Sequence, residues 1–205
     1  TLPGRSPVGP PMPGGAEQAN FAPFHGEMVR PVEQREQLEV VNAANEVVGL
    51  APREDIHRRG LMHRSVHVFL FDHQGRLFIQ KRGKDKDRYP LRYDSSAAGH
   101  VAVGEPCDRT AERELLEELG VTAPLSRLAS FEACAETGWE HVVLYTAATD
   151  APVSVNRQEI EGGLFLTMKQ IGCMISRNRE LFTPDFIYLF SWYKRNVRSP
   201  KRSDA

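Results

Sequence analysis

Three glutamates that lie close together in the sequence are the side chains best placed to do chemistry. Glu114, Glu117 and Glu118 fall within residues 107–119, where apolar residues recur at helical spacing. Steps of three and four residues bring the three carboxylates to roughly one face of that helix. Crowded acids repel one another and raise each other's pKa, and a divalent cation removes that penalty. Hard carboxylate oxygens suit Mg²⁺ or Mn²⁺, which in turn bind substrate phosphates.

The residues around these glutamates favour a metal- or phosphate-binding site over a solvated acidic surface. Taken alone, clustered acids on a helix usually form a solvated face. Here Arg113 can pair with Glu117 one turn away, or with the more distant Glu105, and so hold the acids in orientation. Gly99 and Gly104 bracket the preceding loop, where the backbone must approach a metal or a phosphate closely.

The complete spacing of this segment resembles the Nudix box. The nine matching positions are Gly99, Glu105, Arg113-Glu114-Leu115, Glu117-Glu118 and Gly120-Val121. An accidental match has a probability on the order of 10⁻⁸ per start site at background residue frequencies. The resemblance implies an α/β fold, the Nudix α/β/α sandwich with a central mixed sheet. It also implies cleavage of a diphosphate bond in a nucleoside diphosphate derivative or a related organic pyrophosphate.

The resemblance assigns roles to the box residues. The carboxylates of Glu114, Glu117 and Glu118 would bind Mg²⁺ or Mn²⁺, with the backbone carbonyl of Gly99 as a further ligand. The residues expected to act in catalysis are Glu114, Glu117 and Arg113. Glu114 is the first choice for the general base that takes a proton from the attacking water.

Four residues outside the box are expected to contact the substrate. Arg82 and Lys86 could grip the distal phosphate, whereas Lys84 between them fits an exposed basic turn equally well. Glu140 and Glu159 are expected at the substrate too. Each is also an alternative general base, because bases in this family often lie outside the box helix.

The flanking sequence resembles the isopentenyl-diphosphate isomerase branch of the Nudix proteins and its hydrolase-like bacterial relatives. The matching features span about residues 38–196 and are His63-Arg64, Arg82, Lys86, Pro90, Gly99-His100, Glu140, Glu159-Ile160 and Phe182-Thr183-Pro184. Imidazoles bind metal in the isomerase branch, so His63 and His100 are candidates for a second metal site. His57 is one residue too close to His63 for this pattern, which argues against it as a ligand.

Three functions compete for this sequence. The isomerase needs a cysteine directly before the Gly-His pair as its proton donor and acceptor, and Ala98 occupies that position. The isomerase also has a degraded box, whereas this box is complete, and both features favour hydrolysis. A non-catalytic module that senses a nucleotide is the third function, encouraged only by the proline-rich start of the chain. Clustered carboxylates have no physical purpose in such a module.

The predicted elements alternate between the two types of secondary structure. Strands are expected at 37–41, 47–50, 67–72, 76–81, 128–133, 141–147 and 163–166, and helices at 107–119 and 182–196. Strands interleaved with helices indicate an α/β or α+β domain. Thr183 and Pro184 suit the N-cap and the first position of the second helix, and Gly120 suits the end of the first.

The chain divides near residue 35. Residues 1–35 contain seven of the fourteen prolines and almost no apolar periodicity, which predicts a disordered Pro/Gly-rich arm. Residues 36–200 form the expected Nudix domain, and residues 201–205 a C-terminal tail.

Composition excludes several classes of function. The formal net charge of the 205 residues is -1, which gives no overall attraction to nucleic acid. The three cysteines form no CxxC pair, so a reducing compartment, the cytoplasm, is expected. No apolar run approaches the ~20 residues that cross a bilayer. The expected partner is a small-molecule diphosphate substrate, with a homodimer as a further expectation.

Overall fold

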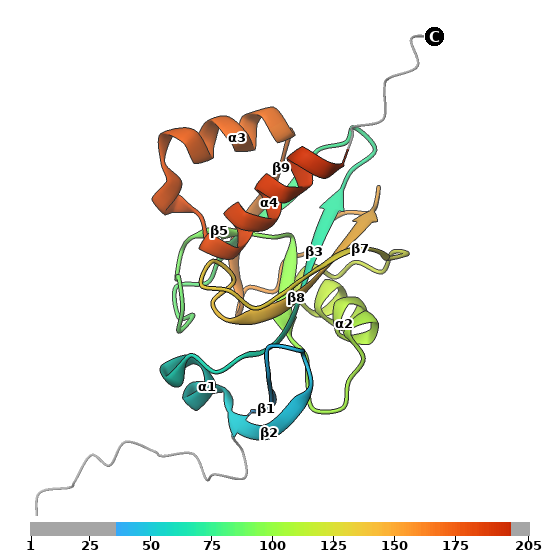
Figure 1. Cartoon of the computed structure of the whole chain (residues 1–205). Helices are drawn as coiled ribbons and strands as arrows, with labels where there is room; N and C mark the ends of the chain where they lie inside the picture. Colours follow the sequence, from blue (N-terminus) through green and yellow to red (C-terminus); the bar gives the residue numbers. More distant parts are fainter. Residues whose placement is uncertain (1–35, 198–205) are drawn as a thin grey trace, which may run out of the picture. The chain divides into compact units, whose positions relative to one another are not determined.

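The computed structural model describes residues 36–197, in which helices cover both faces of a central sheet (Figure 1). The predicted arm 1–35 and tail 201–205 lie outside the described residues. The elements are β1 (Gln37–Val41), β2 (Val47–Pro52), α1 (Arg53–Arg59), β3 (His63–Phe71), β4 (Leu77–Arg82), β5 (Tyr93–Asp94), β6 (Ala97–His100), α2 (Cys107–Leu119), β7 (Ser126–Phe131), β8 (Glu140–Ala148), β9 (Ile160–Leu166), α3 (Met168–Arg177), a 3₁₀ turn (Arg179–Leu181) and α4 (Pro184–Asn196).

The central sheet is mixed, as the resemblance implies. Its strands follow the order β5-β4-β3-β8-β7, with β6 paired to β3 and β9 paired to β4. β3 and β8 run parallel and place His63 opposite Glu140, whereas the other described pairs of this sheet are antiparallel. β1 and β2 form a separate two-stranded sheet.

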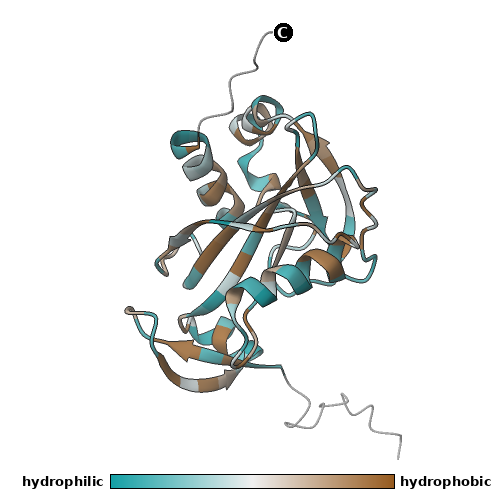
Figure 2. Ribbon diagram, turned by 90° about the vertical axis from the view of Figure 1, so that its right-hand side faces the viewer, coloured by the Kyte–Doolittle hydropathy of each residue, from teal (hydrophilic) through white to brown (hydrophobic). Residues whose placement is uncertain are grey.

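Two hydrophobic cores lie between the layers of the α/β/α sandwich, one on each face of the central sheet. Successive residues of β3 point to opposite faces of the sheet. Val66 and Val68 pack on one face with Leu115 of α2. Phe69 packs on the other face with Phe186 of α4. In Figure 2 the central strands between the helices are largely apolar, which agrees with a sheet that is covered on both sides.

The first half of β3 breaks the apolar pattern. His63, Ser65 and His67 occupy the same face as Phe69, and all three are buried. The sequence predicted that this strand begins at residue 67, because the preceding residues carry no apolar run. The structure begins it at His63, since the parallel pairing with β8 extends to that residue. The strand therefore carries a buried polar face into the site described below.

The sequence predicted the two long helices but missed two short ones. Thr183 caps α4 by accepting a hydrogen bond from the backbone of Phe186, and Pro184 is its first residue, as predicted. Gly120 ends α2 with a left-handed φ of 64°. The structure adds the helices α1 and α3 and the short strands β5 and β6, and it places β7 at Ser126–Phe131 rather than 128–133.

A pair of adjacent glycines in β9 allows a stability prediction. A Cβ added to Gly163 would lie 2.2 Å from Cζ of the buried Phe78, whereas one added to Gly162 would meet nothing within 4 Å. We expect Gly163→Ala to lower the free energy of unfolding by about 1–3 kcal/mol through overpacking. Urea denaturation measures this effect, with Gly162→Ala as the matched control. Equal stabilities of the two variants would contradict the packing described for β9.

Candidate metal-dependent active site

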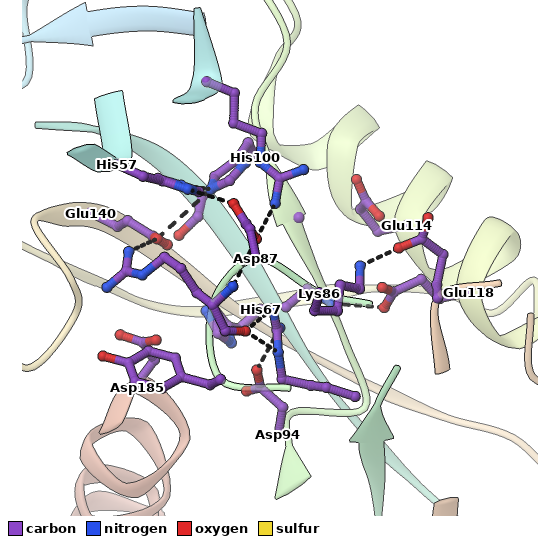
Figure 3. A pocket seen from close by; sticks show the side chains of 18 of the residues that line it. His57, His67, Lys86, Asp87, Asp94, His100, Glu114, Glu118, Glu140 and Asp185 are labelled. Atoms are coloured by element: carbon purple, nitrogen blue, oxygen red, sulfur yellow. Dashed lines mark hydrogen bonds and ion pairs between the residues drawn. The ribbon is translucent and has the colours of Figure 1, made fainter. Parts of the chain in front are cut away.

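A cavity of about 430 Å³ collects most of the predicted site residues (Figure 3). Those that line it are Arg82, Lys86, Gly99, His100, Glu114, Glu117, Glu118, Glu140 and Glu159. The other two predicted residues, Arg113 and His63, lie directly behind the lining, where each contacts a residue of the wall. The structure therefore brings together residues from α2, β4, β6 and β8.

The three glutamates of α2 share one side of the helix but differ in burial. Glu118 is buried, Glu114 is half-buried and Glu117 is exposed. One carboxylate oxygen of Glu118 accepts hydrogen bonds from Nε2 of Gln80 at 3.0 Å and from the backbone N–H of Ala98 at 3.1 Å. Burial, followed by repulsion from Glu114, raises the pKa of Glu118 to about 8. A bound cation would favour the ionised carboxylates.

Arg113 links the acids into one network. Its guanidinium donates to both carboxylate oxygens of Glu105 at 3.2 and 3.1 Å, to Glu114 at 2.8 Å and to Glu117 at 3.1 Å. Both pairings that the sequence allowed for Arg113 are therefore present at once. These bonds, with Glu105 the strongest influence, raise the pKa of Arg113. The arrangement restricts the rotamers of Glu114 and Glu117 and suits a positioning role.

Gly99 allows the acids to approach the sheet. A Cβ on this residue would lie 2.0 Å from Oε1 of Glu114, closer than any side chain permits. Gly99 pairs with Val66 in β3, and its neighbour His100 pairs with Ser65. Because successive strand residues face opposite sides, β6 presents Gly99 to α2 and His100 to a separate cluster of imidazoles.

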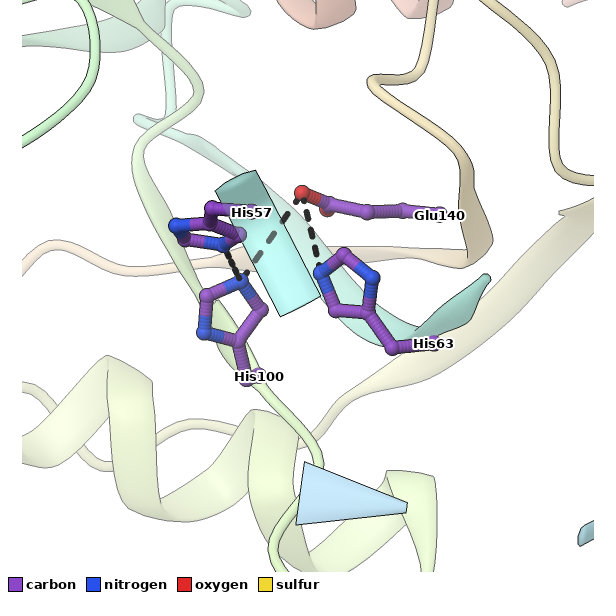
Figure 4. A group of neighbouring side chains, drawn as sticks. All are labelled: His57, His63, His100 and Glu140. Atoms are coloured by element: carbon purple, nitrogen blue, oxygen red, sulfur yellow. Dashed lines mark hydrogen bonds and ion pairs between the residues drawn. The ribbon is translucent and has the colours of Figure 1, made fainter. Parts of the chain in front are cut away.

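That cluster contains four potential metal ligands from four elements (Figure 4). The ligand atoms of His57, His63, His100 and Glu140 all lie within 4.8 Å of one another. Nε2 of His57 is 3.3 Å from Nε2 of His100, and Oε1 of Glu140 is 3.5 Å from Nε2 of His63 and 3.8 Å from Nε2 of His100. Tetrahedral Zn²⁺ with ligands at ~2.0–2.1 Å separates its ligand atoms by about 3.3 Å, so the two shortest of these separations are close to that value and the group as a whole is wider.

Hydrogen bonds to groups outside the cluster hold one ring nitrogen of His57 and of His63, and the other nitrogen of each ring points into the cluster. Nδ1 of His63 donates to the carbonyl of Leu61 at 2.9 Å, and Nδ1 of His57 lies 3.0 Å from a carboxylate oxygen of Asp87. Nε2 of His63 is buried and has no hydrogen-bond partner within residues 36–197. Burial, followed by the charge of His100, lowers the pKa of His57 to about 4, so its imidazole is neutral near pH 7. Neutral imidazole is the form that binds metal.

The structure places His57 in the imidazole cluster, which its spacing in the sequence did not indicate. The spacing argued against His57 as part of a second site, yet the structure places it beside His63 and His100 with centroid distances of 5.5 and 5.0 Å. Helix α1 and the left-handed Gly60 that ends it set the position of this imidazole. The signal in the sequence was a third histidine near the pair, and its role as a ligand stays a prediction.

The predicted phosphate-binding residues already have protein partners. Arg82 donates to Asp94 at 3.1 Å and to the carbonyl of Arg88 at 3.2 and 3.1 Å. The ammonium of Lys86 contacts the carboxylate of Glu159. Contact with a substrate would require Lys86 to leave Glu159, whereas Arg82 is held by the loop. The roles of both residues in binding stay predictions.

Burial of Glu118 leads to a prediction about the metal-free protein. Its pKa is about 8 in the folded chain and 4.5 in its ordinary state, so ionisation is easier when the chain is unfolded. The stability that it contributes is therefore lost as the pH rises from about 5 to 8. Urea denaturation in EDTA should show a larger loss of unfolding free energy over this range for wild type than for Glu118→Gln. The same pH dependence of the unfolding free energy in the two proteins would contradict the raised pKa of Glu118.

Comparison with known proteins identifies the family of this site. The model of the NUDIX domain matches residues 61–186, which is more than half of the chain. This chain belongs to the Nudix family. The resemblance that its box residues suggested is thereby confirmed, and so is the sandwich fold.

Relatives of this Nudix protein carry two kinds of name. It is 27% identical to isopentenyl-diphosphate Delta-isomerase 2 of Photorhabdus laumondii, over 82% of this chain and 94% of the relative. It is 29% identical to the uncharacterized Nudix hydrolase YfcD of Shigella flexneri, over 80% and 90%. The crystal structure of DR0079 from Deinococcus radiodurans is similar with a TM-score of 0.69 and 32% identity, covering 80% of this chain and all of that one.

Proposed function

We propose that this Nudix protein is a metal-dependent pyrophosphohydrolase that cleaves a diphosphate bond in a nucleoside diphosphate derivative or a related organic pyrophosphate. The observation that carries the proposal is the convergence of Glu114, Glu117 and Glu118 on one cavity wall, with Lys86 among the lining residues. The membership of the chain in the family supports a hydrolase in general, and the substrate is part of the proposal.

The donor set of the cavity fits a hard divalent cation. Three carboxylates and the Gly99 carbonyl are oxygen ligands of the kind that Mg²⁺ and Mn²⁺ prefer. Such ions, when bound, neutralise diphosphate and lower the pKa of a coordinated water. Burial raises the pKa of Glu114 against the opposing charge of Arg113, which suits a residue that accepts a proton. Arg113 would orient this carboxylate while it does so.

The imidazole cluster is proposed to hold a second divalent metal. Three imidazoles and one carboxylate match the ligands of Zn²⁺ and similar ions. Burial tends to raise the pKa of Glu140, but the imidazoles of His100 and His63 outweigh it and hold that pKa well below its usual range. Glu140 therefore stays ionised and able to ligate, which makes it a metal ligand in this proposal and Glu114 the preferred base.

The outer hydrogen bond of His57 predicts the effect of a substitution on this second site. Asp87→Asn removes the carboxylate that orients Nδ1 of His57 and should weaken binding of Zn²⁺ or Mn²⁺ there by about 10–100-fold. Titration calorimetry on the metal-free protein measures the affinity, with Asp85→Asn, at an exposed position outside the cavity lining, as the control. Unchanged affinity in Asp87→Asn would argue against the proposed ligand His57.

An isomerase is the alternative that the names of several relatives favour. Ala98 lines the cavity beside Gly99 and His100, and its methyl group cannot transfer a proton. Incubation with isopentenyl diphosphate tests this alternative directly, and conversion would overturn the assignment of the chain as a hydrolase. A nucleotide-sensing module would instead bind diphosphates and release no product.

The test of the proposed activity is a panel of diphosphates assayed for phosphate release. Wild type is incubated with nucleotide sugars, dinucleotides and other organic pyrophosphates, with Mg²⁺ or Mn²⁺ and then with EDTA. We expect turnover of at least one class with either ion and none with EDTA. Binding without turnover across the whole panel would support the sensing module.

Partners and location remain predictions. No helix within residues 36–197 is long and apolar enough to cross a membrane. A homodimer is still expected, and the cytoplasm is the proposed location. Strand β2 carries exposed apolar side chains, Val47, Val48 and Leu50, which a second copy could cover.

A further inference from the structure

Two buried oxygen atoms at the cavity have no hydrogen-bond partner in the described part of the chain. Oγ of Ser65 and Oδ1 of Asp185 make no hydrogen bond within residues 36–197, although both residues line the cavity. Ser65 is only 2% exposed. A buried polar group without a partner destabilises a protein, so such atoms are usually satisfied by water or a ligand. Neither residue has a part in the mechanism proposed above.

The elements of the fold aim these groups at one region. Ser65 and His67 lie two residues apart on β3 and therefore face the same side of the sheet. Asp185 is the second residue of α4, where the Thr183 cap and Pro184 fix the start of the helix. Figure 3 shows Asp185 on the opposite side of the cavity from Glu114, with His67 between them.

Two neighbouring polar side chains in this region already have partners. Asp94 accepts from Arg82 at 3.1 Å, and Nδ1 of His67 is 2.8 Å from Oγ of Ser95. Within residues 36–197, the groups that remain for a ligand here include the hydroxyl of Ser65, Oδ1 of Asp185 and the second ring nitrogen of His67. A hydroxyl group, which both donates and accepts, can hydrogen-bond to each of them.

The walls of the cavity contain few apolar residues that a hydrocarbon chain could contact. Among the described lining residues, no aliphatic side chain is larger than that of Ala98. A prenyl chain placed there would find few apolar contacts and would separate charged groups from water. A group with several hydroxyls would instead hydrogen-bond to the wall.

We propose that Ser65, His67 and Asp185 form a specificity subsite that binds a hydroxyl-bearing organic group, such as a sugar, on the far side of the diphosphate from the acids of α2. The inference rests on the proposed function, because it identifies the group to which the diphosphate is attached. It makes the substrate a polyhydroxylated diphosphate and excludes isoprenoid diphosphates as preferred ligands.

The test compares two non-cleavable ligands that share one anionic end. Ribosyl and isopentyl esters of methylenediphosphonate are titrated calorimetrically into the full chain with Mn²⁺. We expect wild type to bind the ribosyl ester at least tenfold more tightly. Asp185→Leu and, independently, Ser65→Ala should each weaken the ribosyl ester about tenfold and leave the isopentyl ester unchanged. Asp185→Asn, which keeps a hydrogen-bonding group, should retain much of the preference.

Several results would overturn the subsite. Equal affinities for the two esters in wild type, tighter binding of the isopentyl ester, or no binding of the ribosyl ester would each do so. Equal weakening of both esters in the two variants would indicate a general effect on the fold. Because neither ester is cleaved, a preference for ribose in a protein that hydrolyses nothing would refute the proposed function alone. Hydrolysis without any preference would refute the subsite alone.

Discussion

Replacing Glu117 by glutamine is expected to lower kcat on the order of 10³-fold with either Mg²⁺ or Mn²⁺. The amide keeps the shape of the side chain but removes the negative charge that would bind the cation. The fold should persist, because the Glu117 side chain is 56% exposed and its protein contact is an ion pair with Arg113. Phosphate release and unfolding free energy are measured on the same preparation.

Glu112 provides the matched control for this experiment. It lies on the same helix, its side chain is 54% exposed and it pairs with Arg109, yet it does not line the cavity. Glu112→Gln should therefore keep wild-type turnover. Equal activity of Glu117→Gln and Glu112→Gln would show that catalysis does not need the negative charge of Glu117.

The second large effect is expected from Gly99→Ala. The added methyl group would overlap the carboxylate of Glu114 at 2.0 Å, so this side chain must leave its position beside β6. Loss of aligned groups at a reacting centre typically costs about 10²-fold in rate. We expect that decrease in kcat, together with weaker binding of Mn²⁺ in calorimetry.

Gly49→Ala is the control for the glycine substitution. A Cβ on Gly49 meets nothing within 4 Å, and the residue lies in β2, away from the cavity lining. Its activity and metal affinity should match those of wild type. A Gly99→Ala variant with unchanged kcat and metal affinity would show that the position of Glu114 does not matter to the reaction.

The acidic half of the site follows from local sequence. One helix carries Glu114, Glu117 and Glu118, and helical spacing alone puts them on one side. Arg113 is their immediate neighbour, so helical geometry limits its partners to a few nearby acids. Long-range packing was not needed for this part, except to bury Glu118 beneath β6.

The imidazole half and the proposed subsite depend on tertiary contacts that sequence spacing does not encode. Helix α1 has only seven residues and no long apolar stripe, so neither its existence nor the direction of His57 was predictable. Ser65 and His67 share a buried polar face only because β3 begins at His63. The sequence places Asp185 at the start of a helix, but it does not show that the helix points this carboxyl into the cavity.

The loop after β4 shows why charge alone does not identify a phosphate-binding residue. Arg82 was predicted to contact substrate, and its guanidinium is largely engaged by Asp94 and the backbone of Arg88. A long basic side chain serves structure or binding equally well, and only its partners distinguish the two. Lys86, held by a single carboxylate, is the better candidate for a group that moves onto a phosphate.

Hydrolysis in ¹⁸O-labelled water is the most direct test of the central claim, that the acids of α2 support metal-dependent attack of water on a diphosphate. Wild type is incubated with Mn²⁺ and a set of diphosphates that includes isopentenyl diphosphate. The masses of the products are then measured by mass spectrometry to detect incorporated ¹⁸O. We expect one ¹⁸O atom in a phosphate-bearing product from a polyhydroxylated diphosphate, formed on the order of 10³-fold more slowly after Glu117→Gln. Unlabelled products throughout, with isomerised isopentenyl diphosphate among them, would contradict it.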